Sequence, residues 1–221
     1  KEVDNFIYNK LKNLNNVYYF NRDYEFKTIN KKQFIFKFQK NKKTITRPSL
    51  QGFHQIENAS TALTTAMLLK ENNYKIKLNS LGKSIYNTKW PGRIEKVKFK
   101  NKYIIFDGSH NLSGADKLNK YLNENKIHPN VIFGMLNNKN IFEFLSILKK
   151  NIDTLYPIKI PNEKNAYTQK EIYNISKQLK LDSVIEKNFS NINKLLMNQS
   201  NKYILITGSL YLIGKIRRKY L

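Results

Sequence analysis

The spacing of apolar residues changes near the middle of the chain, which predicts two differently built regions. Between Val17 and Thr46, short aromatic runs alternate with polar residues, and Asn and Lys turns separate the runs. Alternation with a period of two is typical of half-buried strands. The first region is therefore predicted to contain a β-meander or a pair of hairpins.

A helical pattern follows Pro48. Between Gln55 and Asn72, apolar residues recur at intervals of three and four, which predicts an amphipathic helix; they are Ile56, Ala59, Leu63, Ala66 and Met67. A second helical pattern covers residues 79–87, and Pro91 and Gly92 then interrupt regular structure. We expect the domain boundary there, giving domains 1–91 and 92–221.

Beyond this boundary, strand and helix patterns alternate. Strands are expected in "IEKVKFKNKYIIFDGS" (two), "NVIFGML", "TLYPIKI" and "YILITGS". Helices are expected over 112–125, 141–150, 168–179 and 210–218, with another short helix after Phe189 and a capping box formed by Thr168 and Glu171. Such alternation predicts an α/β fold with a Rossmann-like, mostly parallel sheet covered on both faces.

Two loops at the expected carboxyl ends of strands carry candidate chemistry, because ligands of parallel sheets bind there. In "DGSHN", Asp107 could accept from a ligand hydroxyl or cap the next helix, and His110 could face the same ligand or be structural. In "TGSLY", Gly208 allows close backbone approach. Ser209 could bind a carboxylate or phosphate, or cap a helix.

Two further residues could complete a site. Arg93, beside the expected hinge, could reach phosphate oxygens or be a solvated surface residue. Asn58, near the start of the first long helix, could read an adenine edge or cap that helix. No phosphate-binding loop, HExxH motif or pair of histidines at ligand spacing is present in the sequence, so these residues form only part of a nucleotide site, with no metal ligand predicted.

Composition narrows the classes of protein. The 221 residues include no Cys, which excludes disulfides and thiol chemistry, and no apolar run approaches the roughly 18 residues that span a bilayer. We therefore expect a cytoplasmic protein without membrane contact. The formal charge of +24 comes mostly from lysines spread along the chain together with Asn, Ile and Tyr. This spread indicates compositional bias rather than a nucleic-acid surface.

Five motifs together resemble one family. "GFHQIENASTALTTA", "WPGRIEKV", "FDGSHNLSGA", "FGMLNNKN" and "ITGSLYLIGKI" occur in the order and at the spacing found in folylpolyglutamate and dihydrofolate synthases of the Mur ligase superfamily. The family often has Pro where this chain has Leu112 and Ala where it has Ser109. Either change affects loop rigidity rather than a contacting side chain.

The resemblance implies an ATP-dependent ligase that adds L-glutamate to a folate or dihydropteroate carboxylate through an acyl phosphate. It assigns ATP binding to Asn58, Arg93 and Asp107, catalysis to His110 and Asp107, and the glutamate and acyl-phosphate side to His110 and Ser209. Residues 1–91 would be the β-rich and helical end of a central ATPase domain.

The family's phosphate loop and most Mg²⁺ ligands would lie upstream of Lys1, so this chain is expected to be inactive alone. We expect a monomer that uses small-molecule substrates and binds no nucleic acid. Two alternatives stay open: a Mur ligase for cell-wall precursors, whose corresponding helix more often opens with His-Asn, and a basic nucleic-acid-binding module.

Overall fold

The computed structural model describes residues 2–14, 16–185 and 201–220. Contacts divide the chain into two units: unit 1 comprises residues 1–49 and 54–88, and unit 2 comprises residues 50–53 and 89–221. The chain therefore passes between the units three times, at 49/50, 53/54 and 88/89. The predicted boundary at 91/92 lies just beyond the last of these passages.

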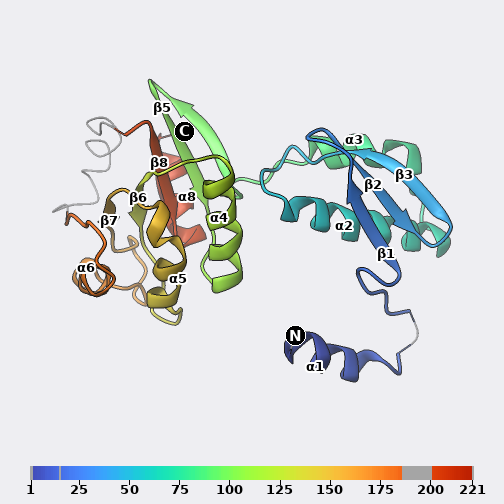
Figure 1. Cartoon of the computed structure of the whole chain (residues 1–221), viewed down its shortest axis with the longest axis horizontal. Helices are drawn as coiled ribbons and strands as arrows, with labels where there is room; N and C mark the ends of the chain where they lie inside the picture. The colour runs from blue at the N-terminus through green and yellow to red at the C-terminus, as the bar shows by residue number, and fades with distance from the viewer. Residues whose placement is uncertain (1, 15, 186–200, 221) are drawn as a thin grey trace. The chain divides into compact units, whose positions relative to one another are not determined.

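Unit 1 contains a three-stranded antiparallel meander in the order β1-β2-β3 (Figure 1). Its elements are α1 (Glu2–Leu11), β1 (Tyr24–Thr28), β2 (Gln33–Phe38), β3 (Asn41–Thr46), α2 (His54–Glu71), a 3-10 turn (Leu78–Ser80) and α3 (Leu81–Asn87). The predicted meander is confirmed. The sequence pattern did not predict α1.

The core of unit 1 follows from the period of each element. Alternate residues Phe34, Phe36 and Phe38 of β2 are buried, as expected for a strand with one covered face. They pack in one cluster with Ile56 and Leu63 of α2. The helical pattern read from the sequence thus marks the buried face of α2, although Ala66 is only half-buried.

Unit 2 is a five-stranded sheet in the order β4-β5-β8-β6-β7, in which only β4 runs antiparallel to its neighbour. Its strands are β4 (Glu95–Phe99), β5 (Lys102–Asp107), β6 (Asn130–Phe133), β7 (Leu155–Pro157) and β8 (Tyr203–Thr207). The central strands β5, β8 and β6 are mostly apolar and are buried along almost their whole length, as parallel strands covered on both faces are. The predicted α/β fold with a mostly parallel sheet is confirmed.

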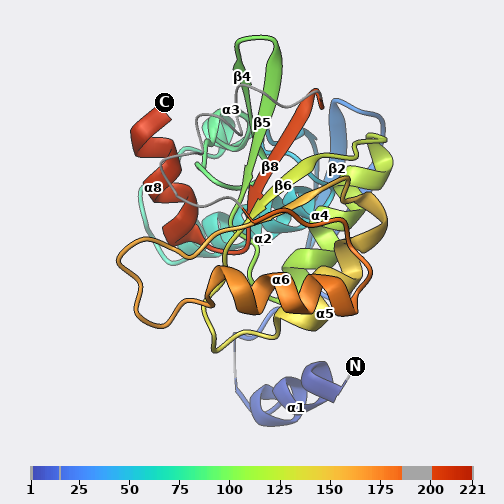
Figure 2. The same ribbon diagram turned by 90° about the vertical axis from the view of Figure 1, so that its left-hand side faces the viewer.

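The helices of unit 2 cover both faces of this sheet. They are α4 (Leu112–Glu124), α5 (Ile141–Leu148), a 3-10 turn (Lys149–Asn151), α6 (Gln169–Gln178) and α8 (Leu210–Tyr220). Figure 2 shows α8 on one side of the sheet and α4 and α5 on the other. Two separate apolar clusters match these faces. The capping box of Thr168 and Glu171 is present, whereas the helix expected after Phe189 lies outside the described residues.

Candidate functional site at the carboxyl ends of the parallel strands

Three of the four adjacent parallel strands of unit 2, β5, β8 and β6, end at the same level. Asp107 of β5 is in register with Thr207 of β8, which is in register with Phe133 of β6. Each of these residues is followed by glycine. Loops that leave the carboxyl ends of parallel strands are where such folds bind ligands, and the two predicted loops lie at this edge.

Glycine is required at this edge because the backbones approach closely. Gly208 has a φ of +100°, and a Cβ placed there would lie 2.6 Å from the Gly134 carbonyl oxygen. A Cβ at Gly134 would lie 2.6 Å from the carbonyl oxygen of Ile158. Residues larger than glycine would therefore collide with the backbone, and the strand ends form a tightly packed edge without side chains at these two positions.

Asp107 is buried, with 4% of its surface exposed. Its Oδ2 accepts a hydrogen bond from the Ile94 backbone N–H (3.0 Å), and its Oδ1 accepts from the Ser109 backbone N–H (3.1 Å). Burial raises the pKa of the carboxyl, and the hydrogen bonds and the charge of Arg93 partly offset that rise. The capping alternative for Asp107 is wrong, because Asn111 caps α4 by accepting from Gly114 N–H.

His110 is half-buried in the same loop. Its Nδ1 lies 2.9 Å from the carbonyl oxygen of Gly108. Because a carbonyl only accepts, Nδ1 must be the donor, which leaves the lone pair of a neutral ring on Nε2. His110 can therefore accept a proton at Nε2 while the loop fixes the ring.

Ser209 immediately precedes α8, and the capping alternative is confirmed for it: its Oγ accepts from the Tyr211 N–H at 3.2 Å. The residue is 4% exposed. Beside it, Thr207 is fully buried, and its Oγ1 has no hydrogen-bond partner among the described residues. Thr207 is not among the site residues predicted from the sequence, since a hydroxyl without a partner has no sequence signature.

Arg93 is exposed on the turn that enters β4, and its charge acts on Asp107. The structure thus brings Arg93, Asp107, His110 and Ser209 to one part of unit 2. Asn58 belongs to unit 1. It lies within α2 rather than at its N-cap, and its Nδ2 donates to Oε1 of buried Gln55 at 3.0 Å.

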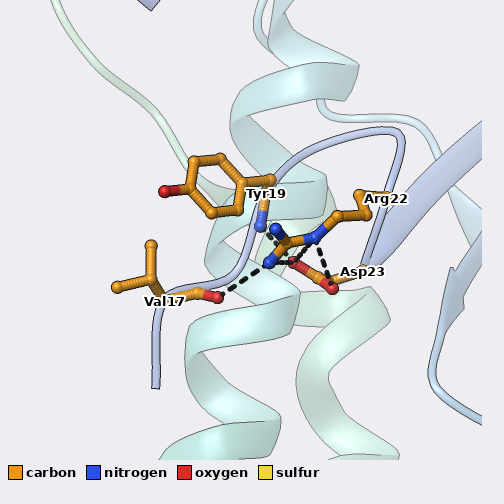
Figure 3. A network of polar contacts seen from close by, with 4 residues as sticks. All are labelled: Val17, Tyr19, Arg22 and Asp23. Atoms are coloured by element: carbon orange, nitrogen blue, oxygen red, sulfur yellow. Dashed lines mark hydrogen bonds and ion pairs between the residues drawn. The ribbon is translucent and has the colours of Figure 1, made fainter. Parts of the chain in front are cut away.

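Unit 1 contains a second polar cluster, shown in Figure 3. The Arg22 guanidinium donates to both carboxylate oxygens of Asp23 and to the Val17 carbonyl, and Asp23 accepts from the Tyr19 N–H. It lines part of a hollow of about 140 Å³ that also includes the exposed Lys37–Glu25 pair. Its charges are paired with one another, so the cluster stabilises the entry to β1 rather than presenting an unmet charge.

Among the described residues, no group of three or more His, Asp or Glu could hold a metal ion. The strand-end residues therefore do not by themselves form such a group. Within the same described part of the chain, no helix is long and apolar enough to cross a bilayer.

Unit 2 has the architecture of the doubly wound α/β class of domains, in which ligands bind at the carboxyl ends of parallel strands. A family model for the C-terminal domain of dihydrofolate synthetase matches residues 92–219, and the chain belongs to this family. The dihydrofolate synthase/folylpolyglutamate synthase of Bacillus subtilis is 31% identical over 195 residues, which are 85% of this chain and 44% of that protein. The chain thus spans about half the length of the relatives it matches.

Solved structures share the fold. The folylpolyglutamate synthase of Thermotoga maritima has a TM-score of 0.74 at 21% identity and covers 99% of this chain, which in turn covers 51% of that one. A bifunctional folylpolyglutamate synthase/dihydrofolate synthase with Mn, AMPPNP and L-glutamate bound has a TM-score of 0.71 at 17% identity, with coverage of 91% and 47%. Because the chain belongs to the dihydrofolate synthetase family, the predicted resemblance to folate ligases is favoured over the alternative of a Mur ligase for cell-wall precursors.

Proposed function

We propose that this chain is the glutamate-adding half of an ATP-dependent amide ligase acting on folate or dihydropteroate. The observation that carries the proposal is the register of two strand ends. Asp107 at the end of β5 is paired with Thr207 at the end of β8, so the loops with His110 and Ser209 leave the sheet at the same edge. Family membership of residues 92–219 supports it. A related fold binds Mn, a nucleotide analogue and L-glutamate together.

The reaction would proceed in two balanced steps. A substrate carboxylate oxygen attacks the terminal phosphorus of ATP. The bond from that phosphorus to ADP breaks, ADP departs, and the substrate becomes an acyl phosphate. The amine of glutamate then attacks the acyl carbon, inorganic phosphate leaves, and the nitrogen gives up a proton. We assign the acceptance of that proton to Nε2 of His110, because Nδ1 is already engaged with Gly108.

The other residues would stabilise charge. Arg93 would contact ATP phosphates, and a guanidinium suits them because it donates in a planar fork. Asn58 would contact adenine from unit 1, oriented by Gln55. Asp107 would act on the nucleotide side mainly by fixing the Ser109–His110 loop, since both of its oxygens accept backbone N–H groups.

Ser209 would lie on the glutamate and acyl-phosphate side, where the N-terminus of α8 favours negative charge. ATP would supply the phosphoryl group, and most Mg²⁺ ligands would lie outside this chain. We place the reaction in the cytoplasm and expect the chain to act as part of a monomer. Calorimetry of the chain alone with ATP should show little heat, because no phosphate loop is present in it.

The test is incorporation of labelled glutamate into folate or dihydropteroate by the longest polypeptide that the gene encodes. His110→Ala should lower kcat by about 100-fold, as loss of a general base does. His128→Ala is the matched control, because His128 is exposed and no role is assigned to it; it should retain full activity. Equal activity of the two variants would refute the assignment of His110.

The nucleic-acid alternative has its own measurement. The chain should not retard a generic DNA or RNA fragment at physiological ionic strength. A salt-dependent shift there would favour a binding module, because phosphate contacts weaken steeply as salt increases.

A further inference from the structure

The turn that carries Arg93 has an unusual backbone. Gly92 has a φ of +75°, and Ile94 has a φ of +50°. A positive φ is strained for a β-branched residue and persists only where the surroundings enforce it. Ile94 is nevertheless 2% exposed and packs in the main apolar cluster of unit 2. Something must therefore hold this turn in place.

Hydrogen bonds hold the turn from three directions. The Gly92 carbonyl accepts from the Gly108 N–H at 2.8 Å, and the Ile94 N–H donates to Asp107 at 3.0 Å. From the other side, the Gly92 N–H donates to Oε2 of Glu95 at 2.9 Å. Both flanks of Arg93 are thus tied to unit 2, although the Arg93 side chain itself is exposed.

Glu95 is held in turn by α8. Arg217 donates through Nε and Nη2 to its carboxylate at 3.0 to 3.2 Å, across 122 positions of sequence. The two side chains are 40% and 22% exposed. A planar two-nitrogen contact fixes the orientation of the carboxylate more firmly than a single contact does. The carboxylate can then aim one oxygen at the Gly92 N–H.

We propose that Glu95 and Arg217 are positioning residues: they lock the Gly92–Ile94 turn to unit 2 and so fix the direction of Arg93. Backbone freedom next to the last passage between the units is then confined to residues 89–91, and Arg93 moves with unit 2. The role given to Arg93 rests on the proposed function, whereas the locking of the turn does not.

The first experiment measures amide hydrogen exchange in this chain and needs no substrate. The Leu205 amide in the core is the reference. In the unsubstituted chain, the Gly92 and Ile94 amides should be protected from exchange. Glu95→Ala should speed exchange at Gly92 by about tenfold or more, because a hydrogen bond to a charged acceptor is lost. Glu95→Gln keeps an acceptor oxygen and should change the rate by less than about threefold.

Arg217 is tested with a neighbour on the same helix. Arg217→Met should speed exchange at Gly92 and Ile94 by about threefold to tenfold, and Arg217→Lys should restore part of the protection. Arg218→Met removes the same charge from an exposed position and should change nothing. The proposal is overturned if Arg218→Met matches Arg217→Met, or if Glu95→Ala leaves Gly92 protected.

The second experiment assays the proposed ligase reaction with the longest polypeptide that the gene encodes. Arg217→Met should raise the KM for ATP by about threefold to tenfold and leave the KM for glutamate unchanged, because Arg93 is assigned to the phosphates. An equal rise in both would refute the positioning role. Absence of ligase activity in the unsubstituted protein would instead refute the proposed function, and the exchange results would still decide whether the turn is locked.

Discussion

Two aspartates in the two units show how burial and partner decide what a carboxylate does. Asp23 in unit 1 is 26% exposed, and hydrogen bonds from the adjacent Arg22 hold its pKa below the ordinary value. Asp107 in unit 2 is nearly inaccessible, it accepts from two backbone N–H groups and from the side chain of Ser109, and burial raises its pKa. The first closes a local turn, whereas the second joins the end of β5 to the turn that precedes β4, 13 residues earlier in the sequence.

The difference between the two aspartates indicates which parts of the fold tolerate substitution. A network of neighbours such as Val17, Arg22 and Asp23 (Figure 3) is solvated, so water can replace its contacts. A buried carboxylate that satisfies two backbone donors cannot be replaced by water. We therefore expect the strand-end edge of unit 2 to be more sensitive to substitution than the entry to β1.

The largest effect is expected at Gly208. Gly208→Ala should destabilise unit 2 by about 3 to 4 kcal/mol, because the positive φ and the contact with the Gly134 carbonyl add strain to overpacking. Gly214→Ala is the control: no atom of the described residues lies within 4 Å of the added Cβ, so helix propensity should give a gain of up to about 1 kcal/mol. Hydrogen exchange at the Leu205 amide measures both.

The direct comparison of the aspartates comes next. Asp107→Ala should cost about 2 kcal/mol, because it leaves the Ile94 and Ser109 N–H groups without their acceptor. Asp23→Ala should have a much smaller effect, since its partner is exposed and solvent replaces the contact. Exchange at Leu205 reports unit 2 and exchange at Phe36 reports unit 1. Equal losses would break the comparison.

The smallest effect is a difference in pH dependence. The raised pKa of Asp107 means that its contribution to stability is lost as pH rises from about 4 through the raised value. The lowered pKa of Asp23 means that its contribution is present above about 4 and lost as pH falls. The free energy of unfolding of the unsubstituted chain minus that of Asp107→Asn should therefore fall as pH rises.

The corresponding difference for Asp23→Asn should rise with pH. Taking each difference against its own variant cancels the other carboxyl groups, such as Glu171. Slopes of the same sign would show that the two carboxyl groups are not in opposite environments.

Sequence patterns predicted the elements of unit 2 well, because continuous apolar strands and Gly-containing loops are local signals. The two strand-end loops were identified for the same reason. The helix α1 was missed, since its apolar residues, such as Phe6, lie exposed rather than marking a core face. The role of Asn111 as the cap of α4 was also missed, although Asn immediately before a helix is a local signal.

Long-range features could not be read from the sequence. Nothing local pairs Glu95 with Arg217 across 122 positions, and nothing marks Asp107 as an acceptor for Ile94 rather than a helix cap. Such partners are set by strand order and register, which bring β4, β5 and α8 together only in the folded unit.

The triple passage of the chain between the units has a practical consequence for dissecting the protein. Residues 50–53 belong with unit 2, and the Phe53 ring lies 4.9 Å from the Lys120 ammonium of α4. A truncated protein that starts at Lys89 would lack this segment and its contact with α4. Expression of unit 2 by itself should therefore retain Leu50–Phe53, for example by grafting the tetrapeptide upstream through a short glycine-rich spacer.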